Sequence, residues 1–168
     1  DQLMGRSIPK KISNICKEAH ETNGNKIYLN TTIKNIIADK NSYKILLSND
    51  EILNVDLVIV GIGSIANTEL FKNKDIKIAN GIITNEYCET SQKDVYAAGD
   101  VSNFFHPFYN KNIRLESYQH AQNHGICAGK NILGIKEVYN NIPWMWSDQL
   151  NINIQLTGLC DDFEKFLQ

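Results

Sequence analysis

Apolar residues recur at helical spacing near the start of the chain. They follow a proline at position 9, which suits the first turn of a helix, and the pattern stops at Asn23-Gly24. The helical positions are Ile12, Ile15, Cys16 and Ala19. This spacing predicts one amphipathic helix.

Four short β-prone runs follow this helix. Polar stretches at 39–42 and 48–51, which are typical of turns, separate the later runs. The four runs cover residues 26–29, 32–38, 43–47 and 55–60. We therefore expect one strand followed by a three-stranded meander.

The middle of the chain alternates between short strands and turns. We expect strands at 76–78 and 82–84 around the turn at Asn80-Gly81, and a further strand at 95–98 that breaks at Gly99-Asp100. Residues 101–112 are rich in aromatic side chains without a regular period. We expect them to form an irregular packed loop.

The last third of the chain predicts a second helix and a strand. Small and apolar residues favour a helix over 117–133, which Gly134 ends, and alternation favours a strand over 152–156. Trp144 and Trp146 lie two residues apart on an extended chain. We expect them to point to opposite faces, with one in a core and the other covering a ring; the alternative places both in a core.

Composition and charge narrow the class of protein. Of 168 residues, 42% are hydrophobic and 21% charged, which is typical of a globular chain, and the net charge of −2 is spread without a basic stripe for nucleic acid. The longest apolar run, 57–63, is far shorter than the roughly 20 residues of a membrane span, and no signal peptide opens the chain. We expect a cytoplasmic protein without a nucleic-acid or membrane role. The first residue is Asp, not Met, which favours a fragment.

Cysteines and histidines form no metal-ligand spacing. The four cysteines lie far apart without a C-x-x-C pair, so we expect free buried thiols and no redox dithiol, zinc or iron–sulfur site. His120 and His124 stand four residues apart on the second predicted helix. Without a nearby acidic motif, we interpret both as surface or packing residues.

Residues 61–66 read G-x-G-x-x-A after a predicted strand. This spelling matches a dinucleotide-binding fingerprint, which opens a long helix and has an acid about 20 residues later. Residues 67–72 leave room for barely two turns of helix. The residues that follow therefore do not provide the context of a dinucleotide-binding fingerprint.

The break at Gly99-Asp100 is a candidate site for chemistry. Glycine tolerates backbone angles closed to other residues, and Asp100 presents an ionised acceptor at the end of a predicted strand. Such an acid suits a ribose or polyol hydroxyl. The alternative is a plain turn with a solvated carboxylate.

Three motifs together resemble a known family. Residues 81–100, the segment Arg114-Leu115-Glu116-Ser117 and residues 143–149 are similar to the ferredoxin, rubredoxin and putidaredoxin reductase group. That group belongs to the FAD-dependent pyridine nucleotide-disulfide oxidoreductase superfamily. The resemblance covers nearly the whole chain and matches the carboxyl-terminal part of such a reductase.

The resemblance implies a fold and a domain division. The fold would be α/β: part of a two-dinucleotide-binding-domain flavoprotein, with Rossmann-like halves and a β-meander, plus the start of an α+β interface domain. Residues 1–62 would end the NAD(P)-binding domain, 63–140 would end the FAD-binding domain, and 141–168 would begin the interface domain. Both glycine-rich phosphate loops would lie before Asp1.

The resemblance also implies positions for cofactor binding. Glu116 and Ser117 would lie beside the pyrimidine edge of the flavin, although by sequence alone Glu116 is better explained as a capping acid in the first turn of the helix. Gly63 would keep the backbone thin near the nicotinamide, and Trp146 would lie near the flavin. The cofactor-binding residues are Gly63, Gly99, Asp100, Val101, Glu116, Ser117 and Trp146, with no catalytic or metal-binding residue.

The implied function is electron transfer. Electrons would pass from NAD(P)H through FAD to a ferredoxin-like iron–sulfur protein or a rubredoxin, and the chemistry would belong to the cofactors. The choice between NADH and NADPH stays open. One alternative is a flavin-binding relative of the apoptosis-inducing-factor group with a signalling or structural role, and another is that the fragment alone is inert.

Overall fold

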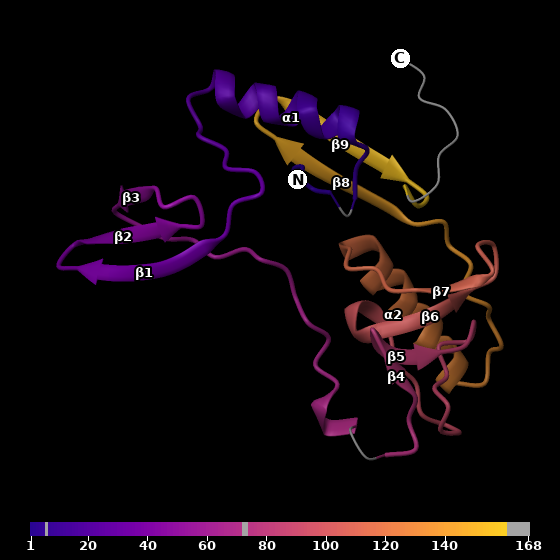
Figure 1. Ribbon diagram of the computed structural model, residues 1–168. Helices are drawn as coiled ribbons and strands as arrows, with labels where there is room; N and C mark the ends of the chain where they lie inside the picture. The colour runs from indigo at the N-terminus through magenta and orange to yellow at the C-terminus, as the bar shows by residue number, and fades with distance from the viewer. Residues whose placement is uncertain (6, 72–73, 161–168) are drawn as a thin grey trace. The chain divides into compact units, whose positions relative to one another are not determined.

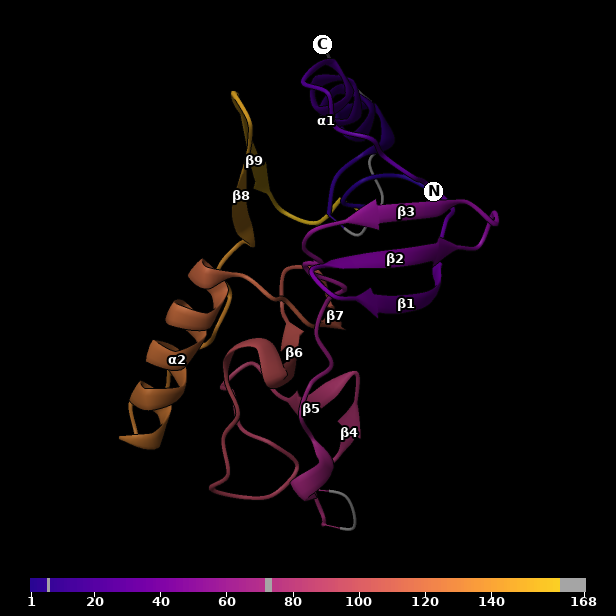
Figure 2. The same ribbon diagram turned by 90° about the vertical axis from the view of Figure 1, so that its left-hand side faces the viewer.

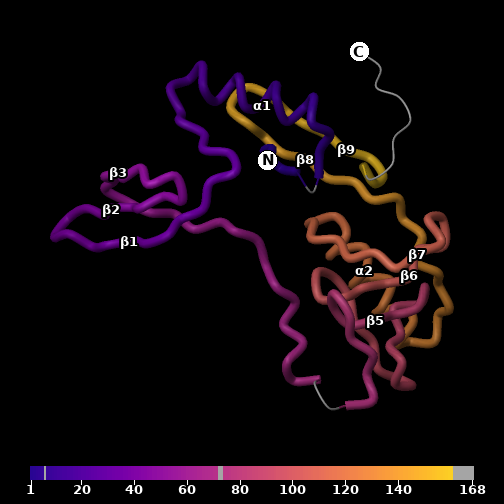
Figure 3. Tube along the Cα trace, viewed as in Figure 1, coloured from indigo at the N-terminus to yellow at the C-terminus, as the bar shows by residue number. Residues whose placement is uncertain are grey.

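The computed structural model describes residues 1–5, 7–71 and 74–160. The chain forms two compact units, Asp1–Gly63 and Ser64–Gln168. Helices and short sheets occur in both units, so the predicted mixed α/β character is confirmed (Figures 1 and 3). The two units are described separately below.

The first unit opens with helix α1, Lys10–Thr22. Pro9 precedes the helix in an extended conformation, and Gly24 follows it with φ +86°. The Gly24 N–H donates to the Glu21 carbonyl at 2.9 Å, which satisfies one of the last carbonyls of the helix. The predicted first helix is therefore confirmed.

An antiparallel meander follows α1 (Figure 2). Its strands are β1, Ile33–Asp39, β2, Ser42–Leu47, and β3, Ile52–Val55. The strand order β1-β2-β3 follows the sequence, because each connection is a tight turn. The predicted three-stranded meander is confirmed, although its third strand ends at Val55 instead of spanning 55–60.

Two other predictions for this part of the chain are wrong. Residues 26–29 form no strand, and residues 56–60 pair with no other segment among those that the structure describes. A β-prone run becomes a strand only where a neighbour pairs with it. Among the described residues, no helix opens at Gly63: residues 64–68 are not helical, and Glu69–Phe71 form only the short 3₁₀ turn η1, so the fingerprint interpretation of 61–66 is not supported.

The second unit contains a four-stranded mixed sheet in the order β4-β5-β6-β7. The parallel pair β5 and β6 lies at its centre, and the outer pairs are antiparallel. The strands are β4, Ile78–Ala79, β5, Gly81–Thr84, β6, Ser102–His106, and β7, Lys111–Ile113. The predicted strands on either side of Asn80-Gly81 are thus confirmed, with slightly shifted bounds.

The prediction of an irregular loop over 101–112 is wrong. Residues 102, 104 and 106 are buried, while 103 and 105 are half-buried, which is the period-two pattern of a strand. Aromatic and imidazole side chains disguised this alternation in the sequence. Pro107 and Asn110 form the turn into β7, with the Asn110 N–H donating to the Pro107 carbonyl at 3.3 Å.

The predicted strand at 95–98 is replaced by an extended segment with one isolated bridge. The Thr90 N–H donates to the Val95 carbonyl at 2.8 Å, and the Ala97 N–H donates to the Cys88 carbonyl at 3.0 Å. These two hydrogen bonds hold one edge of the extended segment against residues 88–90. No described residue pairs along its other edge, so no ladder forms there.

Helix α2, Tyr118–Ile132, confirms the second predicted helix. Ser117 caps its start, because the Ser117 hydroxyl accepts from the His120 N–H at 3.4 Å. Gly134 ends it with φ +82°. Asn131 then fixes the following loop, since its side chain donates to the Glu137 carbonyl and accepts from the Glu137 N–H.

A hairpin of β8, Trp144–Gln149, and β9, Ile152–Thr157, completes the described chain. The rings of Trp144 and Trp146 stack with centroids 5.2 Å apart. The expectation that they point to opposite faces is wrong, because side chains alternate along a strand and residues i and i+2 share a face. Residues 161–168 of the predicted interface domain lie outside the described residues.

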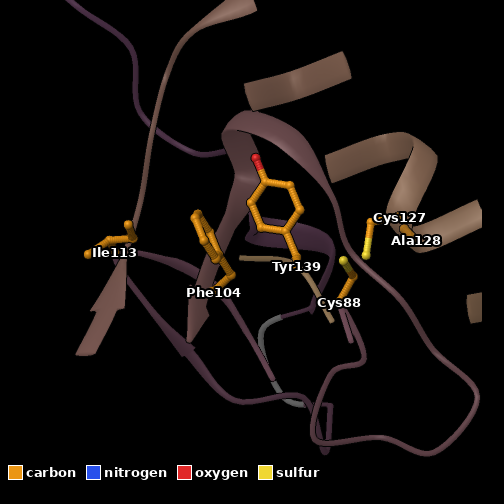
Figure 4. Packing of buried hydrophobic residues seen from close by; sticks show 6 residues of the cluster. All are labelled: Cys88, Phe104, Ile113, Cys127, Ala128 and Tyr139. Carbon is orange, nitrogen blue, oxygen red and sulfur yellow. The ribbon is translucent and has the colours of Figure 1, made fainter. Parts of the chain in front are cut away.

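The core of the second unit forms where β6 meets α2. Figure 4 shows its apolar members, with Phe104 fully buried: Cys88, Phe104, Ile113, Cys127, Ala128 and Tyr139. His120 stacks on Phe104 with ring centroids 4.8 Å apart, and His124 lies at the same distance. Both histidines are buried, which confirms their interpretation as packing residues.

Burial keeps these two histidines neutral. Loss of hydration lowers the pKa of His120 to about 4 and that of His124 to about 3, from an ordinary value of 6.5. Nε2 of each ring has no hydrogen-bond partner among the described residues. Protonation would therefore place an unsolvated charge inside the core.

Gly81 is required by a close backbone approach. Its φ is +110°, and a Cβ there would lie 2.6 Å from the Val101 carbonyl oxygen and 3.1 Å from Cδ of Arg114. Neither a backbone carbonyl of the sheet nor a buried arginine stem can move away cheaply. The tight β4–β5 turn thus depends on glycine at this position.

Replacing Gly81 by Ala should destabilise the protein by about 2–3 kcal/mol or more, because a non-glycine residue at positive φ is strained even before the clash. Gly125→Ala is the matched control, since nothing lies within 4 Å of a Cβ in that helical position. We expect the control to be neutral or to stabilise by up to about 1 kcal/mol. Equal denaturant midpoints for the two variants would contradict this prediction.

The free energy of unfolding should fall as the pH drops below about 6.5. The unfolded chain binds protons at His120 and His124 there, while the folded chain does not until about pH 4 and pH 3. Each histidine then lowers the free energy of unfolding by about 1.4 kcal/mol for every pH unit between 6.5 and its own pKa in the folded chain. Urea titrations between pH 7 and pH 4 measure this slope.

Replacing His124 by Gln should flatten that pH dependence, because one of the two histidines whose pKa is lowered by burial is gone. His20→Gln serves as the control, since His20 lies in the first unit outside the core. A slope that His124→Gln leaves unchanged would show that the core histidines do not govern acid sensitivity.

Candidate functional site

The turn that follows residues 95–98 presents Asp100. Residues Gly99–Val101 form the short 3₁₀ turn η2, and Gly99 adopts φ +72°. The Gly99 N–H donates to Nδ1 of His124 at 3.2 Å, so the core holds the turn in place. Asp100 follows with its side chain exposed to solvent.

The amino-terminal end of α2 lies beside this turn. A Cβ on Gly99 would lie 3.7 Å from both Cα and Cβ of Ala121, which is ordinary van der Waals contact, so the turn packs directly against the helix. The first N–H groups of a helix lack partners within the helix and carry partial positive charge. Ser117, the capping residue, adds a hydroxyl at the same end.

Arg114 connects the turn to the residues before α2. Its guanidinium donates to the Asp100 carbonyl at 3.0 Å and to the Asn80 side-chain oxygen at 3.2 Å. It also forms an ion pair with Glu116. Only 11% of the Arg114 side chain is exposed, so the cation is largely removed from water.

Glu116 lies outside the helix and is not its capping acid. Ser117 is the N-cap, and the first turn of α2 contains no acidic residue. The Glu116 carboxylate instead accepts from Ser64 Oγ at 2.6 Å and pairs with Arg114. The alternative interpretation of Glu116 as a capping acid is therefore wrong.

Trp146 lies near the same end of α2. Its ring meets that of Tyr118, the first residue of the helix, edge to face at a centroid distance of 6.3 Å. Trp146 is 44% exposed. A half-exposed tryptophan therefore stands next to the helix terminus and the residues that precede it.

Six of the seven predicted site residues belong to the second unit. Gly99, Asp100 and Val101 form one turn that Arg114 joins to Glu116, and Ser117 follows directly. Trp146 reaches the group through Tyr118. Gly63 closes the first unit with φ +92°.

Sequence reasoning assigned no role to Arg114, Asn80 or Ser64. Arg114 and Glu116 carry opposite charges two residues apart on an extended segment, which places them on one face. That spacing was the available signal for their ion pair. Nothing local in the sequence indicated that Asn80 and Ser64, which are distant along the chain, would supply the other bonds.

The arrangement suits the binding of a ligand through hydrogen bonds. Within residues 1–5, 7–71 and 74–160, no group of three His, Cys, Asp or Glu side chains could hold a metal ion. Burial raises the pKa of the Cys88 and Cys127 thiols, which keeps them protonated and unreactive. Asp100, the helix terminus and Ser117 instead offer hydrogen bonds to polyol and anionic groups.

The structure also contains a groove that lies apart from this group of residues. An open groove of about 570 Å³, lined in part by Tyr87, Tyr96 and Lys136, includes none of the predicted site residues. No helix in the described part of the chain is both long and apolar enough to cross a lipid bilayer.

Comparison with known proteins gives a consistent result. Residues 1–125 match the family model described as pyridine nucleotide-disulphide oxidoreductase. The chain is 32% identical over 158 residues to the ferredoxin--NAD(+) reductase component of the anthranilate 1,2-dioxygenase system of Burkholderia cepacia. It is 31% identical over 160 residues to rhodocoxin reductase of Rhodococcus erythropolis.

These alignments cover 94% and 95% of this chain but only 39% and 38% of the two relatives, so the chain spans about two fifths of their length. Two solved structures are also similar. A ferredoxin reductase from Rhodopseudomonas palustris has a TM-score of 0.90 at 29% identity, covering 98% of this chain and 41% of that one. The covalent putidaredoxin reductase-putidaredoxin complex has a TM-score of 0.88 at 28% identity, covering 98% and 40%.

The predicted fold class is thereby confirmed as part of the fold of these reductases. The family model covers most of the chain, and the motif residues at 81–100 and 114–117 lie within the matched range. The chain belongs to the pyridine nucleotide-disulphide oxidoreductase family.

Proposed function

We propose that this chain is part of an FAD-dependent reductase that passes electrons from NAD(P)H through FAD to a ferredoxin-like iron–sulfur protein or a rubredoxin. The observation that carries the proposal is the Gly99-Asp100-Val101 turn, which Arg114 joins to Glu116 at the amino-terminal end of α2. The names of the relatives, ferredoxin--NAD(+) reductase and rhodocoxin reductase, support the reaction class.

The chemistry of these residues fits FAD. Asp100 offers a carboxylate to the ribityl hydroxyls, and Gly99 lets the turn that carries Asp100 pack against Ala121 of α2. Ser117 and the first N–H groups of α2 suit the pyrimidine edge, where negative charge collects on reduction. When bound, the flavin supplies hydride acceptance and release of single electrons, which side chains cannot provide.

The domain division follows from the same proposal. Residues 1–62 would end the NAD(P)-binding domain, 63–140 would end the FAD-binding domain, and 141–168 would begin the interface domain. Gly63 would lie at the crossover near the nicotinamide. The three buried free cysteines, Cys16, Cys88 and Cys127, support a reducing compartment such as the cytoplasm.

The full-length protein tests this function directly. We expect it to carry about one FAD per chain and to reduce a ferredoxin or rubredoxin with NADH or NADPH as donor. A colourless full-length protein, or one that holds FAD without reducing any such acceptor, would contradict the proposed reaction.

Asp100→Ala in the full-length protein should weaken FAD retention more than it lowers stability. A hydrogen bond to a charged group contributes about 1.5–3 kcal/mol, so the dissociation constant of FAD should rise by roughly ten- to a hundredfold. Fluorescence titration of the apoprotein measures it. Asp75→Ala, which removes another exposed acid of the second unit, is the control, and equal FAD affinity in both variants would make Asp100 only a turn residue.

Trp146→Ala should slow reduction of the iron–sulfur partner more than reduction of the flavin by nicotinamide, because Trp146 stands half-exposed at the helix terminus of the site. Stopped-flow measurement of the two half-reactions separates these effects. Trp144, stacked on Trp146 and 36% exposed, provides the matched control. If both variants lower the melting temperature equally and leave partner reduction intact, the placement of Trp146 is wrong.

A further inference from the structure

Arg114 bonds to three separate parts of the proposed flavin site. It reaches the β4–β5 turn through Asn80, the η2 turn through the Asp100 carbonyl, and the segment before α2 through Glu116. Gly81 makes room for it, because a Cβ there would lie 3.1 Å from Arg114 Cδ. Asn80 and Asp100 lie 34 and 14 residues from Arg114 in sequence, whereas Glu116 lies only two residues away.

The charges of Arg114 and Glu116 are mutually dependent. An arginine side chain keeps its charge under all ordinary conditions, and here only 11% of it is exposed. Glu116 is 32% exposed in its side chain, so its carboxylate is partly desolvated as well. Removing one partner would break this ion pair at a place where both charges are partly removed from water.

We infer that Arg114 is a positioning residue, which fixes the Asp100 backbone and the Glu116 carboxylate at the flavin and neutralises the Glu116 charge there. This inference rests on the function proposed above. An unneutralised carboxylate close to the flavin disfavours the addition of electrons, so Arg114 raises the reduction potential of the bound cofactor. The bonds to Asn80 and to the Asp100 carbonyl act separately, through geometry.

The test uses the full-length protein with FAD bound and measures the midpoint potential by spectroelectrochemical titration. Arg114→Gln should shift the potential to a more negative value, because it removes the positive charge that Arg114 places beside Glu116. The double variant Arg114→Gln, Glu116→Gln should move the potential back toward that of the parent. Lys111→Gln, which removes a cation from the exposed start of β7, should leave the potential unchanged.

Arg114→Lys separates charge from geometry. Lysine keeps the positive charge but lacks the planar fork that reaches several acceptors at once. We expect the potential to stay at the parent value while the dissociation constant of FAD rises about tenfold, through loss of a charge-assisted bond. This variant also decides the question if Arg114→Gln fails to fold.

Two results would overturn the inference. A potential that Arg114→Gln leaves at the parent value, in a protein that still binds FAD, would refute the role of Arg114 and leave the proposed function intact. An Arg114→Lys variant that binds FAD as tightly as the parent but at a shifted potential would also refute it. A full-length parent without FAD would instead remove the proposed function, and the inference with it.

Discussion

Packing of Phe104 against α2 is the interaction on which the rest of the second unit depends. Phe104 comes from the centre of β6, and it contacts His120 and His124 on one helix and Tyr139 beyond its end. His124, one of these two histidines, also accepts a hydrogen bond from the Gly99 N–H through Nδ1. The core therefore fixes both the angle of the helix terminus and the position of the turn before Asp100, so core packing and site geometry are one arrangement.

The sequence predicted the elements that local patterns determine. Both long helices have a proline or serine start and a glycine end, and the meander has polar turns at the right intervals. The failures have a common physical origin in contacts that are distant along the chain. Residues 56–60 look like a strand but find no described neighbour, whereas 102–106 look irregular and form one because β5 and β7 lie on either side. The two tryptophans were misplaced for a different reason, namely a wrong assignment of strand alternation.

Motifs indicated the candidate site residues, but not the residues that support them. Asp100, Glu116 and Ser117 belong to short segments whose residue types indicate ligand chemistry. Asn80 and Ser64, by contrast, act through side chains 34 and 52 residues away in sequence, at Arg114 and Glu116. A single sequence holds no signal for such pairs, because their proximity arises only when the sheet and helix have packed.

Polar groups are buried in two different ways in this small unit. His120 and His124 avoid the cost of a buried charge by staying neutral, since burial lowers the pKa of each. Arg114 cannot lose its charge, so it must collect acceptors: Glu116, the Asp100 carbonyl and Asn80. That requirement holds in the folded chain whether or not a ligand is present. The same desolvated cation thus holds both the Asp100 turn and the Glu116 carboxylate in position.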